Sequence, residues 1–283
     1  MKKNLSVITT LLIGLTLISC SRVNPASDFI YGLTDDGKGV IIREYVGKSY
    51  KINIPTEIEG IPVVKVGNEK EVSFISASEK VSELMQSKIT EAEFIEWAEK
   101  SPSYKLNIPS SVKEIGFLGG FYKGGFPKLI INVKTENLTS IASLGFKDQT
   151  ILEPIVISKD CKIGGAAFQN SKIENVIFQE GVTQIGEVEK HEEYGRPWYN
   201  VENYIFSNST IKSLSLPSTL TEINGHQFIN CKNLTNVDIP DNTKIKYFAT
   251  FTIYEEPSKC FSGCALTIES QQKIKLTGYT GPF

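Results

Sequence analysis

The sequence predicts a β-rich solenoid in which short strands from successive repeats stack in parallel. The first observation is a recurring motif, Ile-Pro or Leu-Pro followed by spaced branched residues and then Phe, whose clearest copies begin at Leu216-Pro217 and Ile239-Pro240. The second is its period, since Phe206 and Phe228 lie 22 residues apart. A unit this short cannot bury its own apolar face and must pack on its neighbours, so the repeats predict one continuous stack.

The composition favours a folded body and argues against a nucleic-acid partner. Hydrophobic residues make up 40% of the chain and charged residues 22%, and no long polar tract interrupts the repeats. The formal net charge is −2. Because nucleic-acid binding needs a basic surface, this balance argues against that function.

Residues 1–20 have the pattern of an export signal. Two lysines precede an apolar stretch, residues 7–18, that is shorter than the roughly 20 residues needed to cross a bilayer. The stretch ends in Leu-Ile-Ser-Cys, which resembles a bacterial lipobox and implies that Cys20 becomes the lipidated N-terminus. We expect residues 21–28 to be a short tether. The alternative is an ordinary secreted protein with a chance cysteine.

The folded body is expected over residues 29–283, and it opens with a capping hairpin over residues 29–49. Residues 29–33 and 40–45 have strand-like patterns, and the Asp-Asp-Gly-Lys-Gly run between them is typical of a turn. Such a cap covers the apolar end of a solenoid, which would otherwise associate edge to edge. We expect the segment from Cys260 onward to close the other end.

Four cysteines follow Cys20, and their positions favour packing over chemistry. Cys231 and Cys264 occupy the same place in their repeats, which predicts a column of small buried side chains. Cys161 falls where other repeats carry Val, again a core position. Cys260 is out of register, but without a Cys-x-x-Cys spacing or a companion histidine it does not predict a metal site. Its pairing with another cysteine stays open.

Three insertions interrupt the period, near residues 68–103, 187–204 and 246–259. Each follows the same step of a repeat, the Ile-Gly position, which is Val66-Gly67 in the first case, Ile185-Gly186 in the second and Ile245 in the third. In a stacked solenoid, the same position of successive repeats lies along the same edge of the stack. We therefore expect the three insertions to emerge along one rim, where binding loops commonly lie.

The first insertion has a helical pattern. Its apolar residues recur at helical spacing, and Thr90 with Glu93 predicts a capping box that starts a second helix. We interpret the insertion as a helical hairpin packed on the flank of the solenoid. The alternative is a docking element for a partner.

The second insertion carries the candidate partner-binding residues, which are Tyr194, Arg196, Trp198 and Tyr199. Tyr, Trp and Arg are the side chains most enriched at interface hot spots. Aromatic residues of the third insertion could extend this patch, namely Tyr247, Phe248, Phe251 and Tyr254. The alternative is that these rings pack on one another and hold the long loops down.

No catalytic constellation or cofactor motif is recognisable. The chain has two histidines and lacks an HExxH zinc motif, a Gly-x-Ser-x-Gly elbow and a phosphate-binding glycine loop. We therefore predict no catalytic residue, no metal ligand and no cofactor. His226 falls within a repeat and is interpreted as a polar residue of the rim. A polysaccharide-acting solenoid enzyme stays as an alternative, although no neighbouring repeats present paired acids at one inward position.

Several stretches carry a resemblance to a known family: Gly39–Tyr45, the first repeat from Ile52-Asn53-Ile54-Pro55, the repeats from Ile108 onward and the ending Gly278–Phe283. In these the chain resembles the BspA-like leucine-rich repeat surface lipoproteins. Individual repeats depart from the family's Ala-Phe-x-x-Cys pattern by replacing Ala or Cys. The resemblance implies two short strands per repeat in a curved parallel stack. It also implies adhesin activity toward host extracellular proteins or other bacteria.

These features together predict a non-enzymatic lipoprotein at the outer membrane or cell surface. Its expected role is to bind host extracellular proteins or the surface proteins of other bacteria, with no nucleic acid and no cofactor. A periplasm-facing structural lipoprotein without an external ligand fits the same sequence.

Overall fold

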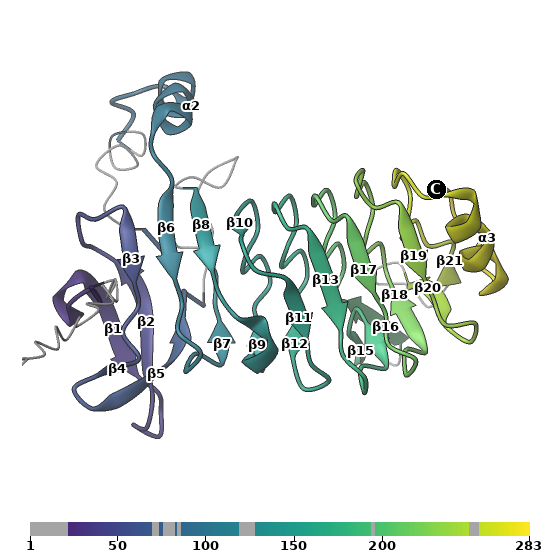
Figure 1. Ribbon diagram of the computed structural model, residues 1–283, viewed down its shortest axis with the longest axis horizontal. Coiled ribbons are helices and arrows are strands. Elements are labelled where there is room, and N and C mark those ends of the chain that lie inside the picture. The colour runs from purple at the N-terminus through teal and green to yellow at the C-terminus, as the bar shows by residue number, and fades with distance from the viewer. Residues whose placement is uncertain are drawn as a thin grey trace, which may run out of the picture.

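Figure 1 shows the computed structural model, in which the chain forms an elongated stack of coils running from the N-terminal to the C-terminal end. The structure describes residues 22–69, 74–75, 83, 86–118, 128–193, 196–248 and 255–283. The expected export signal and Cys20 lie outside these residues. Within the described ranges, no helix is both long and apolar enough to cross a membrane.

A β-hairpin closes the N-terminal end of the stack. The 3-10 helix η1 (Ala26–Asp28) leads into β1 (Phe29–Leu33), which pairs antiparallel with β2 (Val40–Tyr45). The Asp- and Gly-containing turn between the strands closes through the amide of Thr34, which donates to the carbonyl of Gly39 at 2.8 Å. The expected hairpin cap is therefore confirmed.

Successive coils contribute short strands to two sides of the stack (Figure 1). On the first side, one parallel sheet consists of β3 (Lys51–Asn53), β6 (Tyr104–Asn107), β8 (Leu129–Asn132) and β10 (Thr150–Ile151). A second parallel sheet consists of β11 (Ile155–Ile157), β13 (Asn175–Phe178), β17 (Ser213–Ser215) and β19 (Asn236–Asp238). The 3-10 helix η2 (Thr135–Asn137) follows β8.

The second side of the stack is also built mainly from parallel strands. There β2 is followed by β5 (Ile61–Val66), β7 (Glu114–Ile115), β9 (Ser140–Ile141) and β12 (Lys162–Ile163), with β4 (Glu57–Ile58) antiparallel to β5. A separate sheet holds β14 (Gln184–Ile185), β18 (Glu222–Asn224), β20 (Lys244–Phe248) and the antiparallel β21 (Glu255–Glu256). The predicted β-rich solenoid is confirmed.

Branched residues at alternate strand positions form the core. In β11, Ile155 and Ile157 are buried while Val156 between them is half-buried, as the two-residue period of a strand requires. Neighbouring coils repeat this arrangement, so the apolar stripe of each coil is covered by the next one. The stability of the stack therefore depends on contacts between coils.

A column of phenylalanines fills the turns that follow the second strands of five successive coils, from the coil of β9 onward. Its members are Phe146, Phe168, Phe206, Phe228 and Phe261, and each is fully buried. Neighbouring ring centroids lie 5.0 to 5.6 Å apart with interplanar angles of 4° to 19°. These separations are those of stacked aromatic pairs. We call these five residues the phenylalanine column.

After the last four column phenylalanines, the position three residues on holds a small side chain: Ser171, Ser209, Cys231 and Cys264. Cys231 Sγ donates to the carbonyl of Phe206, and Cys264 Sγ donates to the carbonyl of Phe228, both at 3.1 Å. The predicted cysteine column therefore exists, although Cys264 is half-buried, and it links each of the last two turns to the one before it. The cysteines of the described chain carry free thiols: Cys161, Cys231, Cys260 and Cys264.

A helix that the sequence did not predict closes the C-terminal end. This helix, α3 (Ile268–Leu276), packs beside β19. After it, the ring of Tyr279 lies edge-on to Phe261, with centroids 6.1 Å apart and an interplanar angle of 79°, and covers the end of the phenylalanine column. The helix escaped prediction because it buries little: Ser270 and Ile274 are its buried residues.

The first insertion leaves the solenoid later than expected. Phe74 and Ile75 are buried, and the carbonyl of Phe74 accepts from the amide of Tyr45 at 2.7 Å, so the chain still follows the coil at this point. Only afterwards does α2 (Glu91–Lys100) form, beyond the end of β6 in Figure 1. Figure 1 places α2 at one edge of the stack and the second insertion at the opposite edge. The expectation of one shared rim is therefore wrong for the first insertion.

Helix α2 begins as the sequence predicts. Thr90 Oγ1 accepts from the amide of Glu93 at 3.2 Å, and Glu93 Oε2 accepts from the amide of Thr90 at 2.7 Å, which completes a capping box. Phe94 is buried and its ring centroid is 5.5 Å from that of Trp97. The first of the two expected helices falls mostly outside the described residues.

Candidate binding site at the second insertion

The second insertion forms a hairpin of two antiparallel strands, β15 (Val188–Glu193) and β16 (Arg196–Val201). Three of the four predicted partner-binding residues lie on β16, and these are Arg196, Trp198 and Tyr199. The fourth, Tyr194, lies outside the described residues. The hairpin therefore places Arg196, Trp198 and Tyr199 on one strand.

The register of the hairpin divides these positions between two faces. Trp198 is paired with His191, and Arg196 is paired with Glu193. Because the side-chain period of a strand is two, positions 196 and 198 fall on one face of the hairpin and position 199 falls on the other.

Hydrogen bonds at the base fix the hairpin to the preceding coil. The amide of Glu202 donates to the carbonyl of Glu187 at 2.8 Å and closes the base. The carbonyl of Asn203 accepts from the amide of Ala166 at 2.8 Å, and the amide of Gly165 donates to the Glu202 carboxylate. The hairpin thus returns directly into the phenylalanine turn of its own coil.

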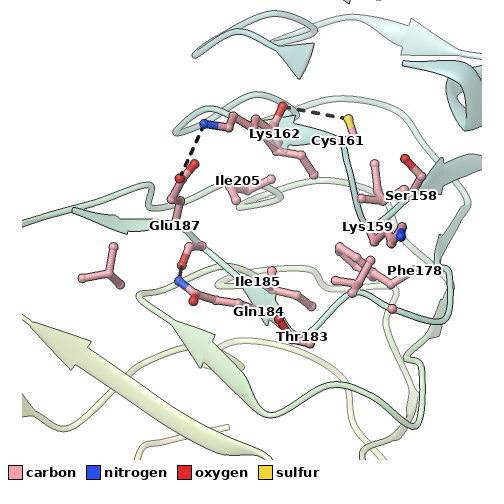
Figure 2. Close-up of a pocket in the computed structure, with 16 residues that line it drawn as sticks. Ser158, Lys159, Cys161, Lys162, Phe178, Thr183, Gln184, Ile185, Glu187 and Ile205 are labelled. Carbon is pink, nitrogen blue, oxygen red and sulfur yellow. Dashed lines mark hydrogen bonds and ion pairs between the residues drawn. The ribbon is translucent and has the colours of Figure 1, made fainter. Parts of the chain in front are cut away.

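A pocket of about 370 Å³ opens at the foot of the hairpin, between the coils that carry β12 and β14 (Figure 2). Buried core residues form its floor: Ile157, Phe178, Val182, Ile185 and Ile205. Polar and charged residues form its lip: Ser158, Lys159, Lys162, Thr183, Gln184 and Glu187. Its volume lies at the lower end of the range for ligand sites, roughly 300 to 1,000 Å³.

The charges of the pocket lie at its two ends. Lys162 Nζ and Glu187 Oε1 form an ion pair at 4.0 Å across one end, as Figure 2 shows. Lys159 lies at the other end, is exposed, and has no ion-pair partner among the described residues. Both lysines extend from the segment that contains β12. The wall of the pocket formed by this segment therefore carries more positive charge than the wall formed by β14.

Cys161 is half-buried in the wall of the pocket, although the sequence predicts a core position. Burial raises the pKa of its thiol to about 11, so the group is protonated at neutral pH and is a poor nucleophile. Among the described residues, no group of three or more His, Cys, Asp or Glu side chains could hold a metal ion. What the pocket offers chemically is an apolar floor with a hydrogen-bonding lip, which suits binding.

The third insertion covers His226, which is not a rim residue. His226 is 6% exposed, its ring centroid is 4.0 Å from that of Tyr247, and its Nδ1 accepts from the amide of Lys259 at 3.1 Å. Burial, followed by the charge of Lys259, holds the pKa of this imidazole below its usual 6.5. The rim interpretation is wrong because β20 and the segment before the next phenylalanine turn close over the side chain. Phe251 and Tyr254 lie outside the described residues.

The pocket itself is a feature that the sequence did not predict. Ile163-Gly164 and Ile185-Gly186 carry the same repeat signal, which predicts paired strands in both coils. Nothing in either segment marks the separation of β12 from β14. An insertion also follows β20, yet β18 and β20 remain paired, so an insertion alone is not a signal for such an opening.

Comparison with known proteins identifies the repeat. The chain matches the model of the BspA type leucine rich repeat region, in six copies, over residues 97–188 and 199–277. It is similar to the crystal structure of the T. pallidum leucine rich repeat protein TpLRR, with a TM-score of 0.60 and 22% identity over 93% of this chain and 99% of that one.

Two further solved structures are more distant. A leucine rich cell surface protein of Faecalibacterium prausnitzii gives a TM-score of 0.49 at 18% identity, covering 87% of this chain and 53% of that one. A leucine-rich repeat protein of Bacteroides ovatus gives a TM-score of 0.41 at 18% identity, covering 77% and 54%. No curated protein matches the chain.

The family match also delimits the hairpin. It stops at residue 188 and resumes at residue 199, so most of β15 and the start of β16 fall outside the repeat pattern. The matched ranges nevertheless span more than half of the chain, and the T. pallidum protein shares the fold. The chain therefore belongs to the BspA-type leucine-rich repeat family.

Proposed function

We propose that this chain is an exported, lipid-anchored protein of the cell surface that binds a protein partner through the β15–β16 hairpin. Leucine-rich repeat domains are in general protein-interaction modules, because stacked repeats offer extended surfaces and loops for contact. The observation that carries the proposal is the hairpin, which interrupts the family repeat and is held at its base by the neighbouring coil.

The geometry of the stack supports the proposed anchoring. The described chain begins at the N-terminal end of the stack, where the amide of Asn24 donates to the carbonyl of Asn53 in β3 at 3.1 Å. The chain already contacts the stack at Arg22, whose carbonyl accepts from Asn53 Nδ2 at 2.9 Å, so a lipid on Cys20 would hold this end close to the membrane. The hairpin lies in the C-terminal half of the stack (Figure 1). It would therefore stand away from the membrane and face outward.

The residue types of the hairpin support a protein partner. Trp198, Tyr199, Tyr194 and Arg196 belong to the types that dominate binding energy at protein interfaces. The proposed partners are host extracellular proteins or surface proteins of other bacteria.

The test is a binding screen with purified mature protein against immobilised extracellular-matrix proteins and bacterial surface extracts. We expect the wild-type chain to bind at least one of them, and the triple variant Arg196→Ala, Trp198→Ala, Tyr199→Ala to bind at least about 10-fold more weakly. The matched control replaces Leu152 and Leu276, which are 63% and 77% exposed, with alanine. This control removes exposed apolar surface elsewhere and should bind like the wild type.

Equal binding by the triple variant and the wild type, with circular dichroism spectra that coincide, would show that the hairpin is not the contact surface. A mature chain that binds nothing in either panel would instead favour the structural lipoprotein of the periplasm.

A further inference from the structure

The second side of the stack is open at one place. β12 and β14 come from adjacent coils but belong to different sheets, whereas β9 pairs with β12 and β14 pairs with β18. The same two coils are joined elsewhere, because β11 pairs with β13 and the rings of Phe168 and Phe206 stack at 5.0 Å. The coils are therefore parted on one side only, and the pocket described above occupies the opening.

The edge of β12 that faces this gap presents unpaired backbone groups. The amides of Lys162 and Gly164 donate to carbonyls of the β9 coil at 3.0 and 2.8 Å. In a parallel sheet, alternate residues of a strand direct their backbone N–H and C=O groups to opposite neighbours. Lys162 and Gly164 bond toward β9, so the N–H and C=O of Ile163, which lies between them, are directed toward β14. No backbone hydrogen bond within the described ranges engages these two groups of Ile163.

The edge of β14 that faces the gap also presents an unpaired N–H and C=O. The carbonyl of Thr183 accepts from the amide of Glu222 in β18 at 3.1 Å, so the alternation turns the N–H and C=O of Gln184 toward β12. Across the part of the chain that the structure describes, no hydrogen bond joins these groups to β12. The gap is thus lined on both sides by strand edges that present a donor and an acceptor.

The floor and the ends of the gap set two further requirements for the side chains of any segment that occupies it. A side chain pointing inward from the gap would meet Ile157, Ile185 and Ile205, which are 2%, 2% and 1% exposed. Such a side chain must be apolar. At the open end, Lys159 has no ion-pair partner among the described residues, which favours an acidic group there.

We propose that an extended peptide segment of the protein partner occupies this gap as an added β-strand. Its backbone pairs with Ile163 on one side and Gln184 on the other, one apolar side chain fills the floor, and an acidic side chain lies beside Lys159. Adding a strand to an unpaired sheet edge is an established mode of peptide recognition, and here two edges face the same segment. This inference rests on the proposed function and specifies the segment of the partner that it recognises.

The state of the gap is tested first by amide hydrogen exchange on the unliganded mature protein. We expect the amides of Ile163 and Gln184 to exchange at least about 100-fold faster than two hydrogen-bonded amides nearby, that of Gly164, which follows β12 and donates to Ile141, and that of Glu222, which lies in β18 and donates to Thr183. Equal protection of all four amides would show that β12 and β14 are paired in solution and would overturn the proposal.

The occupant is tested with a phage-displayed library of linear heptapeptides selected on the wild-type protein. We expect selected peptides, made synthetically, to protect the amides of Ile163 and Gln184. N-methylation of the peptide backbone should weaken binding at least about 10-fold, because it removes the ladder hydrogen bonds. Lys159→Glu should weaken binding similarly, and Lys232→Glu, at another exposed lysine, should not.

Two outcomes overturn the proposal, namely a library that yields no peptide whose binding depends on Lys159, and peptides that bind equally well after N-methylation. The hairpin variant keeps this test separate from the test of the proposed function. If that variant loses the partner and no peptide enters the gap, the hairpin function stands and the strand-addition proposal fails. If peptides enter the gap and the hairpin variant keeps the partner, the hairpin assignment fails instead.

Discussion

At the scale of single residues, the position two places after each column phenylalanine has a left-handed backbone. Its φ is 63° at Asp148, 57° at Asn170, 56° at Asn208, 59° at Asn230 and 76° at Gly263. Asn, Asp and Gly are the residues that tolerate this region at least cost. The turn therefore selects these residues for their backbone and not for a ligand.

Asn208 gives a direct test of this interpretation, because its side chain is exposed and only the backbone demands its type. We expect Asn208→Gly to change stability little, and Asn208→Val to lower the free energy of unfolding by about 1–3 kcal/mol, since a branched residue is strained at positive φ. Urea denaturation of both variants would measure the difference. Two variants of equal stability would show that the turn does not impose the left-handed conformation.

His226 predicts a pH dependence of stability. The pKa of the unfolded side chain is 6.5, and that of the folded side chain is lower because of burial and Lys259. The unfolded chain therefore binds more protons in this range, so the contribution to stability is complete above pH 6.5 and is lost as the pH falls toward the folded pKa. The free energy of unfolding, measured between pH 7.5 and pH 5, should fall more steeply for the wild type than for His226→Asn.

The asparagine variant keeps a side-chain acceptor near the position of Nδ1 but cannot be protonated, so it isolates the titration. Identical slopes for the wild type and His226→Asn would contradict the assignment.

At the scale of the structural element, the phenylalanine column is what holds adjacent turns together. Phe206 is fully buried, and its ring stacks on Phe168 at 5.0 Å and on Phe228 at 5.4 Å. Phe206→Ala should lower the free energy of unfolding by about 3–5 kcal/mol through the cavity and the lost contacts. Phe206→Leu should cost less. Leu152→Ala, at an exposed site, serves as the control in chemical denaturation, and a Phe206→Ala cost no larger than that of the control would show that the column is not structural.

Elements with a local chemical signal could be predicted from the sequence, and elements set by packing could not. The Asp-Gly turn of the cap, the Thr90–Glu93 capping box and the Phe period each have a signal within a few residues. The helix α3 has a capping signal at Thr267, whose side chain accepts from the amide of Ser270, but its Lys-Ile-Lys-Leu run alternates like a strand and hides the helical period. The position of α2 depends on where Phe74 packs, and the gap between β12 and β14 depends on how two coils sit relative to each other.

The candidate site shows the same division. The hairpin was visible in the sequence as an interruption rich in Tyr, Trp and Arg, and the structure gives it two strands and a defined base. The pocket at its foot could not be seen, because its floor consists of residues that the repeat pattern assigns to an ordinary core, such as Ile157 and Ile185. Unpaired backbone groups leave no trace in the amino-acid sequence.

At the scale of the whole molecule, the stack separates its two ends. The N-terminal cap, next to the proposed lipid anchor, lies at one end, and the hairpin lies in the opposite half (Figure 1). A solenoid is suited to this arrangement because each coil adds length along one axis. The arrangement serves binding only if the stack extends into the surroundings of the cell.

Protease accessibility on intact cells tests this central claim most directly. Cells that express the full chain are treated with an external protease, and the mature chain is detected alongside a periplasmic marker that reports the integrity of the envelope. The account predicts loss of the mature chain while the marker stays intact. Survival of the chain until the envelope is opened would contradict surface display and would favour a structural lipoprotein that faces the periplasm.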